Sequence, residues 1–360
     1  MEMELEAAKK ANLDWSVKVF CPYKAGEISR LFEFSKLAQA KTGKSSYWNR
    51  VCSVLKLSHE YHSWLLSKER EVDIFVLRYH PHDLFQLCFL KKTRKPVYFV
   101  HHTLEVPELY SSRNVTGIIK GLVEKVMGKR AIIKSKATIG VTSEIIEYEI
   151  NRTRQQNRKT ILYPNGILIS ESIPKDKRGS VPEILFVANH FQIWQGLDLL
   201  LESIEKSKSV FTLHLVGNIP SKEMERLQKE PRIILHGKLT AAQIQSLSES
   251  SWVGLSSLAL YRKQMAEAST LKVREYLNNG LPAYAAYRET LPINFPYYKQ
   301  GNPDIAQILN YCNEMRNVSR SDVRNAAAPY IDKAILLNRL KDEIVKFEEL
   351  TSVTPLSFSP

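Results

Sequence analysis

The sequence has 360 residues, of which 44% are hydrophobic and 25% charged, as is typical of a globular protein with about two domains. Its net charge of +13 favours anionic partners such as nucleic acid, acidic lipid or phosphorylated small molecules. No run is long and apolar enough for a membrane-spanning helix, and the start MEMELEAAKK lacks the apolar core of a signal peptide. The four scattered cysteines form no CxxC pair, which argues against a disulfide framework or structural zinc and suits a reducing cytoplasm.

In the first half, short runs rich in Val, Ile, Phe and Tyr predict β-strands separated by helices. These predicted strands are residues 15–20, 72–79, 96–101, 137–142 and 160–163. Alternating strands and helices form parallel sheets through right-handed βαβ units. The chain opens in a helical pattern, ELEAAKKANL, where a doubly wound domain normally has a strand and a Gly-rich turn. We therefore expect either a start upstream of Met1 or a domain that lacks a usually central strand.

The second half repeats this rhythm after a polar linker, ESIPKDKRGSVPE, at residues 171–183. Its predicted strands are residues 184–188, 212–216, 233–236, 253–256 and 283–286. The fold class is therefore predicted as α/β, with two doubly wound Rossmann-like domains facing a cleft and ligands at the carboxyl ends of the strands. We expect a first domain over 1–167, a second over 168–330, a terminal helix over 331–350 of the kind that can cross back, and a tail over 351–360.

The stretch EASTLKVREYLNNGLP, residues 267–282, predicts a short helix in the second half. Thr270 or Ser269 is a suitable N-cap, the helix extends to about Leu277, and Asn279-Gly280 ends it. A helix N-terminus presents unpaired N–H groups and partial positive charge, which suit a phosphate.

Four charged side chains accompany this helix start. Lys272 and Arg274 add positive charge for a phosphate, whereas the carboxylates of Glu267 and Glu275 suit sugar hydroxyls, from which they accept hydrogen bonds. Any one of these residues is more often part of a capped, solvated helix. Together they indicate a diphosphate flanked by hydroxyl-bearing rings, which describes a nucleotide-sugar.

This region resembles the retaining, GT-B-fold glycosyltransferases of the family 4 type, or group 1 glycosyl transferases. The donor-site signature E-x7-E, followed by EYL, Gly and Pro, is found as Glu267, Glu275-Tyr276-Leu277 and Gly280-Leu281-Pro282. Further landmarks follow in the family's order: YPNG at 163–166, ILFVANHFQIWQGLDLLLESI at 184–204, LHLVGN at 213–218 and IILHGKLT at 233–240. The resemblance covers about residues 141–282 and is weak before residue 101.

The resemblance implies transfer of a sugar from a nucleotide diphosphate sugar to a glycan or lipid-linked acceptor, with retention of anomeric configuration. Bacterial surface polysaccharide synthesis (lipopolysaccharide, capsule or exopolysaccharide) is the expected setting. No cofactor is expected, and the lack of an Asp-x-Asp motif fits a metal-independent enzyme. It implies that Glu275 binds the ribose and that Glu267 contacts the transferred sugar. The other implied donor-site residues are Gly196, Gly237, Lys238, Leu239, Ser269, Thr270 and Leu271.

The chain departs from the family at a basic pair that usually lies in the first loop of the second domain. The corresponding residues here are the neutral Asn189 and Gln195. Because negative charge builds on the leaving diphosphate, cations are still required. Lys272 and Arg274 are the predicted substitutes.

Acceptor-site candidates follow strand ends in the first half. In the family a histidine in the position of His101 or His102 lines the cleft near the reacting carbon, whereas a plain strand-end pair would have no such role; we weigh the two equally. Arg78 and His80 follow another strand. Thr142 and Ser143 resemble the family's small hydroxyl pair, which completes the predicted acceptor site.

A basic segment from Asn114 to Thr138 interleaves apolar residues with lysine and arginine. It predicts peripheral association with an anionic membrane, on the inner face of the cytoplasmic membrane. The alternative, a core-facing helix with a solvated outer face, is slightly favoured for the apolar stripe alone. Two other functions stay open: a GT-B-fold nucleotide-sugar epimerase, and a basic protein that binds lipid or nucleic acid. Nucleic acid is not expected, since the sequence has no recognition-helix, RNP or zinc pattern.

Overall fold

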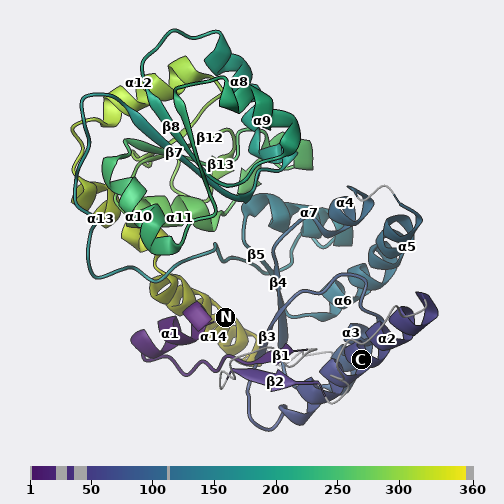
Figure 1. Ribbon diagram of the computed structural model, residues 1–360. Coiled ribbons are helices and arrows are strands. Elements are labelled where there is room, and N and C mark those ends of the chain that lie inside the picture. The colour runs from purple at the N-terminus through teal and green to yellow at the C-terminus, as the bar shows by residue number, and fades with distance from the viewer. Residues whose placement is uncertain (1, 22–30, 36–46, 112–113, 354–360) are drawn as a thin grey trace. The chain divides into compact units, whose positions relative to one another are not determined.

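The computed structural model describes residues 2–21, 31–35, 47–111 and 114–353 (Figure 1). The chain divides into two compact units, Met1–Tyr163 with Leu337–Pro360, and Pro164–Leu336. Within the described residues, no helix combines the length and apolarity needed to cross a membrane.

In its described residues, the first unit contains two separate parallel sheets. Their strands are β1 (Val19–Cys21) and β2 (Phe32–Phe34), which pair with each other, and β3 (Phe75–Arg78), β4 (Val97–His101), β5 (Thr138–Gly140) and β6 (Thr160–Leu162), in that order. The helices are α1 (Glu2–Lys10), α2 (Tyr47–Ser67), α3 (Leu84–Lys92), α4 (Glu105–Ser111), α5 (Val115–Val123), α6 (Lys129–Lys134), α7 (Ser143–Thr153) and α14 (Lys333–Val353), with a π-helical turn, η1 (Glu124–Gly128), between α5 and α6.

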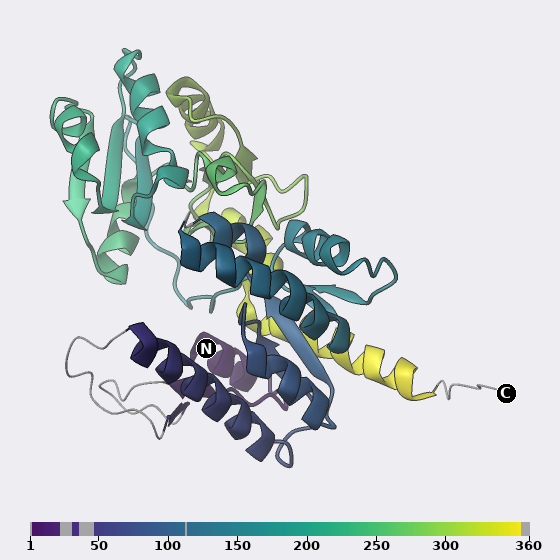
Figure 2. The ribbon, with the colours of Figure 1, turned by 90° about the vertical axis from the view of Figure 1, so that its right-hand side faces the viewer.

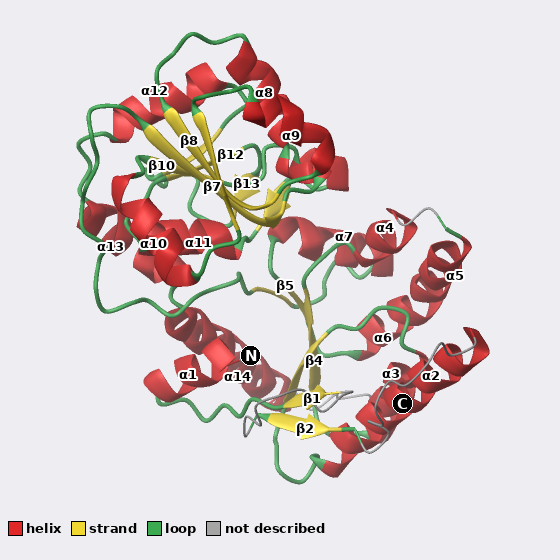
Figure 3. Cartoon of the chain, viewed as in Figure 1, coloured by secondary structure: helices red, strands yellow, loops and turns green. Residues whose placement is uncertain are grey.

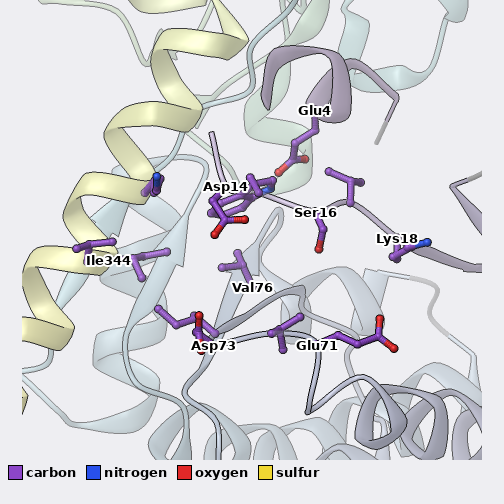
Figure 4. Close-up of a pocket in the computed structure, with 14 residues that line it drawn as sticks. Glu4, Asp14, Ser16, Lys18, Glu71, Asp73, Val76 and Ile344 are labelled. Carbon is purple, nitrogen blue, oxygen red and sulfur yellow. The ribbon is translucent and has the colours of Figure 1, made fainter. Parts of the chain in front are cut away.

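The two sheets of the first unit are not paired with each other in the described part of the chain. Among the described strands, β1 pairs only with β2 and β3 only with β4. A hollow of about 360 Å³ is lined by residues of the segment before β1, such as Ser16, and by residues at the start of β3, such as Val76. Figure 4 shows this hollow, with Glu4 from α1 and Ile344 from α14 also lining it. The described part of this unit thus lacks a strand that would join the two sheets.

The second unit is a doubly wound domain around a six-stranded parallel sheet (Figure 3). The strand order is β14 (Tyr298–Gln300), β12 (Ala283–Ala285), β10 (Val253–Leu255), β7 (Glu183–His190), β8 (Thr212–Asn218) and β9 (Ile233–Gly237); β11 (Glu267–Ala268) and β13 (Arg288–Glu289) form a separate parallel pair. The helices are α8 (Leu197–Glu205), α9 (Ser221–Gln228), α10 (Ala241–Ser250), α11 (Leu271–Asn278), α12 (Ile305–Met315) and α13 (Arg320–Ile331), with 3-10 turns η2 (Ile193–Gln195) and η3 (Leu260–Lys263).

The core of this unit lies on both faces of the sheet because successive side chains of β7 point to opposite sides. Phe186 packs with leucines of α8 such as Leu200, and Leu185 packs with Val273 and Leu277 of α11. Strands buried on both faces are continuous apolar runs, which is why the sequence identified β7 and β8.

The unit boundary lies at Tyr163, earlier than the expected residue 167. The reason is local: Asn165 bonds to Ser269, Gly166 lies close to Leu336, and Ile167 forms a bridge with Asp332. The terminal helix α14 belongs to the first unit from Leu337 onward, and there Tyr98 donates to a Glu348 carboxylate at 2.5 Å (Figure 2 shows α14 in yellow). Of the predicted tail, residues 351–353 belong to α14 and residues 354–360 lie outside the described part of the chain.

Candidate functional site

The candidate donor site of the second unit begins with β11, which precedes α11. Glu267, at the start of β11, is buried, and its Oε1 lies 3.5 Å from Nε of the exposed Arg288. Two residues, Ser269 and Thr270, separate β11 from α11, which begins at Leu271, as expected, and ends before Gly280, whose φ of 68° is left-handed. A Cβ at Gly280 would lie 2.5 Å from the backbone oxygen of Arg320, so the stop requires glycine.

The hydroxyls before α11 serve the fold rather than the helix end. Thr270 occupies the N-cap position, but its hydroxyl lies 2.9 Å from the Tyr287 hydroxyl and makes no capping hydrogen bond. The Ser269 hydroxyl accepts from the backbone N–H of Asn165 at 2.8 Å. Thr270 therefore occupies the predicted N-cap position, but its side chain does not cap the helix.

The consequence is an open helix end. Among the described residues, no acceptor lies at the backbone N–H groups of Leu271, Lys272 or Val273. These three donors, with the partial positive charge of the helix start, are what an anion requires. The prediction that backbone groups around residues 269–271 hold a diphosphate stays a prediction, and the open donors lie slightly later.

Lys272, predicted to supply positive charge in place of the family's basic pair, lies beside Gln195, one of the two neutral residues found at that pair's positions. Its Nζ lies 3.1 Å from Oε1 of Gln195, which also accepts from the Ser257 hydroxyl at 3.1 Å, and it lies 5.5 Å from the centre of the Phe186 ring. Burial lowers the pKa of Lys272 to about 7, against an opposing effect of the Glu275 carboxylate. A diphosphate at this ammonium would favour its charged form.

Arg274 requires a correction. Its guanidinium is fully buried and lies 2.7 Å from Oε1 of Glu289, and it donates to the backbone oxygen of Asn165 at 2.9 Å and to the hydroxyl of Thr290 at 2.6 Å. These contacts leave it turned into the domain and unable to contact a ligand. It holds the loop before α11 instead, with Glu289 as a partner that the sequence did not suggest.

The EYL triplet divides between solvent and core because α11 turns 100° per residue. Glu275 is exposed, as a ribose contact requires. Tyr276 is buried; its hydroxyl donates to the Leu255 backbone oxygen at 3.1 Å and accepts from the Val187 N–H at 3.0 Å. Only the glutamate of the triplet is available to a ligand.

The glycine-containing loops of the second unit lie at the carboxyl ends of strands. Gly196 has a φ of 72°, and a Cβ there would lie 2.9 Å from that of Leu258, so this loop before α8 requires glycine. Gly237, with a φ of 64°, begins the exposed turn with Lys238, while Leu239 is partly buried. The contacts of these positions with a donor stay predictions.

In the first unit, His101 is completely buried, which corrects its predicted place at a substrate. Its Nδ1 lies 2.8 Å from Oε1 of Glu105, and its ring stacks on Tyr79 at 4.5 Å between centroids. Burial lowers the pKa of His101 to about 4, so the ring is neutral. Because it has no exposed surface, it is a structural residue.

Three buried carboxylates and one guanidinium surround His101. Arg152 binds Glu149 at 2.6 Å and Glu124 at 2.7 Å, and Glu105 lies next to Glu149. Burial raises the pKa of Glu149 to about 8 and that of Glu105 to about 6, so the pair shares a proton at neutral pH. Sequence reasoning missed this cluster, for which the His101–Glu105 spacing of four residues was the available signal.

The same cluster is the group of described side chains that could hold a metal ion. Donor atoms of His101, Glu105 and Glu149 lie within 4.8 Å of one another. A proton shared between Glu105 and Glu149 is the alternative to a metal ion there; Nε2 of His101 has no hydrogen-bond partner among the described residues.

The remaining acceptor candidates differ in how far their side chains are exposed. Thr142 is buried, and its hydroxyl caps α7 by accepting from the Ile145 N–H at 3.2 Å, so its prediction as an acceptor contact is corrected. Ser143 and His102 are partly buried. Arg78 and His80, around the end of β3, are exposed.

Comparisons with known proteins show the fold. No family model matches the chain, and no curated protein does. Among solved structures, sucrose-phosphate synthase from Thermosynechococcus elongatus is similar with 16% identity and a TM-score of 0.67, over 98% of this chain and 92% of that one. The apo form of the lipopolysaccharide outer core galactosyltransferase WaaB matches with 14% identity and a TM-score of 0.57, over 88% and 83%. Anabaena HepE in complex with UDP matches with 14% identity and a TM-score of 0.55, over 81% and 82%. The chain has the GT-B fold, an α/β fold with two Rossmann-like domains.

Proposed function

We propose that this protein is a glycosyltransferase that moves a sugar from a nucleotide diphosphate sugar to a glycan or lipid-linked acceptor, with retention of anomeric configuration. The observation that carries the proposal is the start of α11, where three N–H groups are open and the same first turn carries Lys272, whose ammonium contacts Gln195. Donors and a cation at a helix start are suited to a diphosphate.

The donor contacts proposed are all in the second unit. The diphosphate binds at the first turn of α11 and Lys272, the ribose at Glu275, and the transferred sugar at Glu267. The exposed turn at Gly237 and Lys238 borders the base. Arg274 acts indirectly, since its hydrogen bond to the Asn165 backbone and its ion pair with Glu289 hold the segment from which α11 starts.

In the proposed reaction, the acceptor hydroxyl forms the new bond to the anomeric carbon as the bond from that carbon to the diphosphate oxygen breaks. The electron pair of the broken bond goes to the departing oxygen, which takes up the acceptor's proton from the same face. Lys272 and the N–H groups stabilise the charge that develops there; one such preorganised donor contributes about 10²–10³ in rate in known enzymes. No nucleophilic residue is required by this route.

Several finer parts of the proposal have indirect support. Glycosyltransferases of the same fold act on lipopolysaccharide (WaaB) and bind UDP (HepE), which supports a nucleotide-sugar donor and a surface-polysaccharide product. Membership of family 4, metal independence, and a location on the inner face of the cytoplasmic membrane belong to the same proposal. His102, Arg78, His80 and Ser143 are the proposed acceptor contacts.

Thermal-shift measurements with UDP-, GDP-, ADP- and CMP-sugars test the donor class. We expect one nucleotide to raise the melting temperature, and chelation of divalent ions to leave that shift unchanged. Anomeric NMR signals of the product then report retention. Turnover to an epimer without acceptor would favour the epimerase instead, and steep salt dependence with no response to any sugar nucleotide would favour the basic binding protein.

A further inference from the structure

The first unit has a second hollow, of about 690 Å³, that the donor site does not involve. Apolar side chains from α2, including Leu55, Leu57 and Tyr61, form one wall, and Phe20 of β1 and Phe85 of α3 also line it. A volume of this size is in the range of small-molecule sites. We call it the α2–α5 hollow.

Polar groups of this hollow belong to the β3–α3 loop and to α5. His80 and His82 come from the loop that follows β3, and Lys120 comes from α5. His82 has a left-handed φ of 54°, and its Nδ1 is buried without a hydrogen-bond partner among the described residues. Such a backbone conformation is unusual outside glycine and is held here by the His82 N–H, which donates to Oε2 of Glu124 at 2.6 Å.

The acidic group of the hollow is already engaged. Asp83 accepts from the Ser58 hydroxyl at 2.6 Å and from the Phe85 N–H at 3.0 Å, and its other oxygen lies 3.8 Å from Nε2 of His62. The exposed Lys120 has no ion-pair partner among the described residues. Two imidazoles and the Lys120 ammonium remain among the groups that line this largely apolar space, and they suit an anion bound there.

A face of exposed apolar side chains continues from Lys120 along α5 and η1. Its members are Val115, Ile118, Ile119, Leu122 and Val126, each at least half exposed. Glu124, the acidic residue of the basic segment 114–138, is fully buried and paired with Arg152. The apolar stripe is therefore not core-facing, and apolar groups mixed with cations are typical of a helix that rests on an anionic membrane.

We propose that the α2–α5 hollow binds the hydrocarbon chain of an anionic lipid, with its phosphate at His80, His82 and Lys120, while the exposed face of α5 contacts the membrane. This rests on the proposed function, because it selects the lipid-linked acceptor from the acceptors considered. An apolar peptide fits less well, since its amides would find no hydrogen-bond partners along the wall of Leu55, Leu57 and Phe20.

Binding of dodecyl phosphate, below its micellar concentration, tests the hollow by calorimetry. We expect it to bind at least 10-fold more tightly than either inorganic phosphate or dodecanol. Leu57→Trp, which fills the space, and Lys120→Gln, which removes the cation, should each weaken it at least 5-fold. Ile293→Ser and Lys206→Gln, at exposed positions of the second unit, are the matched controls and should change nothing.

Sedimentation with phosphatidylglycerol vesicles separates the hollow from the membrane face. Replacing Ile118 and Ile119 by serine should reduce vesicle binding and leave dodecyl phosphate binding intact, whereas Leu57→Trp should do the reverse. Equal affinities for the three small probes, or unchanged binding in both Leu57→Trp and Lys120→Gln, would overturn the proposal. These binding measurements contain no nucleotide-sugar. A protein that binds the lipid but responds to no sugar nucleotide would therefore contradict the proposed transferase function and leave the lipid proposal standing.

Discussion

Each unit buries a cluster of charged side chains, and the two clusters differ in how charge is balanced. In the second unit, Arg274 faces a single carboxylate, Glu289. In the first unit, three carboxylates surround one guanidinium, that of Arg152, and two of them share a proton. Buried carboxylates in excess of cations take up protons, so the first cluster is sensitive to pH, whereas the second is sensitive to the loss of a partner.

The largest effect is expected from Arg274→Met. It leaves the Glu289 carboxylate buried and unpaired, which costs about 3–5 kcal/mol in comparable pairs. Chemical denaturation should show this loss of unfolding free energy, and donor binding should weaken with it because the loop before α11 loosens. Arg339→Met, at an exposed arginine of α14, is the matched control. A stable Arg274→Met protein that has lost only donor binding would return Arg274 to the ligand site.

Lys272→Met tests the cation that lies two residues before Arg274 on α11 and outside its buried ion pair. We expect turnover to fall about 10²–10³-fold, since a charge that stabilises the leaving group is removed. The melting temperature should hold or rise, because burial disfavours the Lys272 ammonium. Initial rates with the identified donor provide the measurement, and Lys206→Met is the control. Wild-type rates in Lys272→Met would remove this residue from the diphosphate site.

Glu275→Ala should affect the donor alone. Glu275 is exposed, so the fold should be indifferent, while the loss of charged hydrogen bonds to a ribose should weaken binding by about 1.5–3 kcal/mol. Calorimetry with the nucleotide diphosphate measures this, with Glu202→Ala on α8 as the exposed control. Unaltered affinity would contradict the ribose assignment.

The sequence predicted elements better than contacts between them. Apolar runs located strands such as β7 and β8, whereas β11 and β13, with two residues each, are too short to show any period. The bounds of α11 followed from Thr270 and Asn279-Gly280. The role of Arg274 did not, because its partner Glu289 lies 15 residues later and reaches it through the β11–β13 pairing. Non-local partners leave no local pattern.

The cluster of the first unit was missed for the same reason: Glu149 of α7 lies near His101 of β4 but is 48 residues away in the sequence. Apart from the four-residue spacing of His101 and Glu105, the sequence carries no sign of this cluster. Figure 1 shows α4 and α7, which carry Glu105 and Glu149, above the carboxyl ends of β4 and β5.

Glu149→Gln should remove the pH sensitivity of this cluster. The folded-state pKa of Glu149 is raised to about 8, so its protonated form stabilises the fold at low pH, and this stability is lost as pH rises through 8. Between about pH 5 and 8 the wild type should lose up to about 1.4 kcal/mol per pH unit relative to Glu149→Gln, and nothing further at higher pH. The amide that this substitution introduces can donate to Glu105 while its oxygen accepts from Arg152. Denaturation at several pH values measures the difference, and Glu147→Gln, exposed on the same helix, should follow the wild type. Parallel pH profiles for wild type and Glu149→Gln would mean that the excess charge is balanced in another way, and that the two clusters do not differ as described.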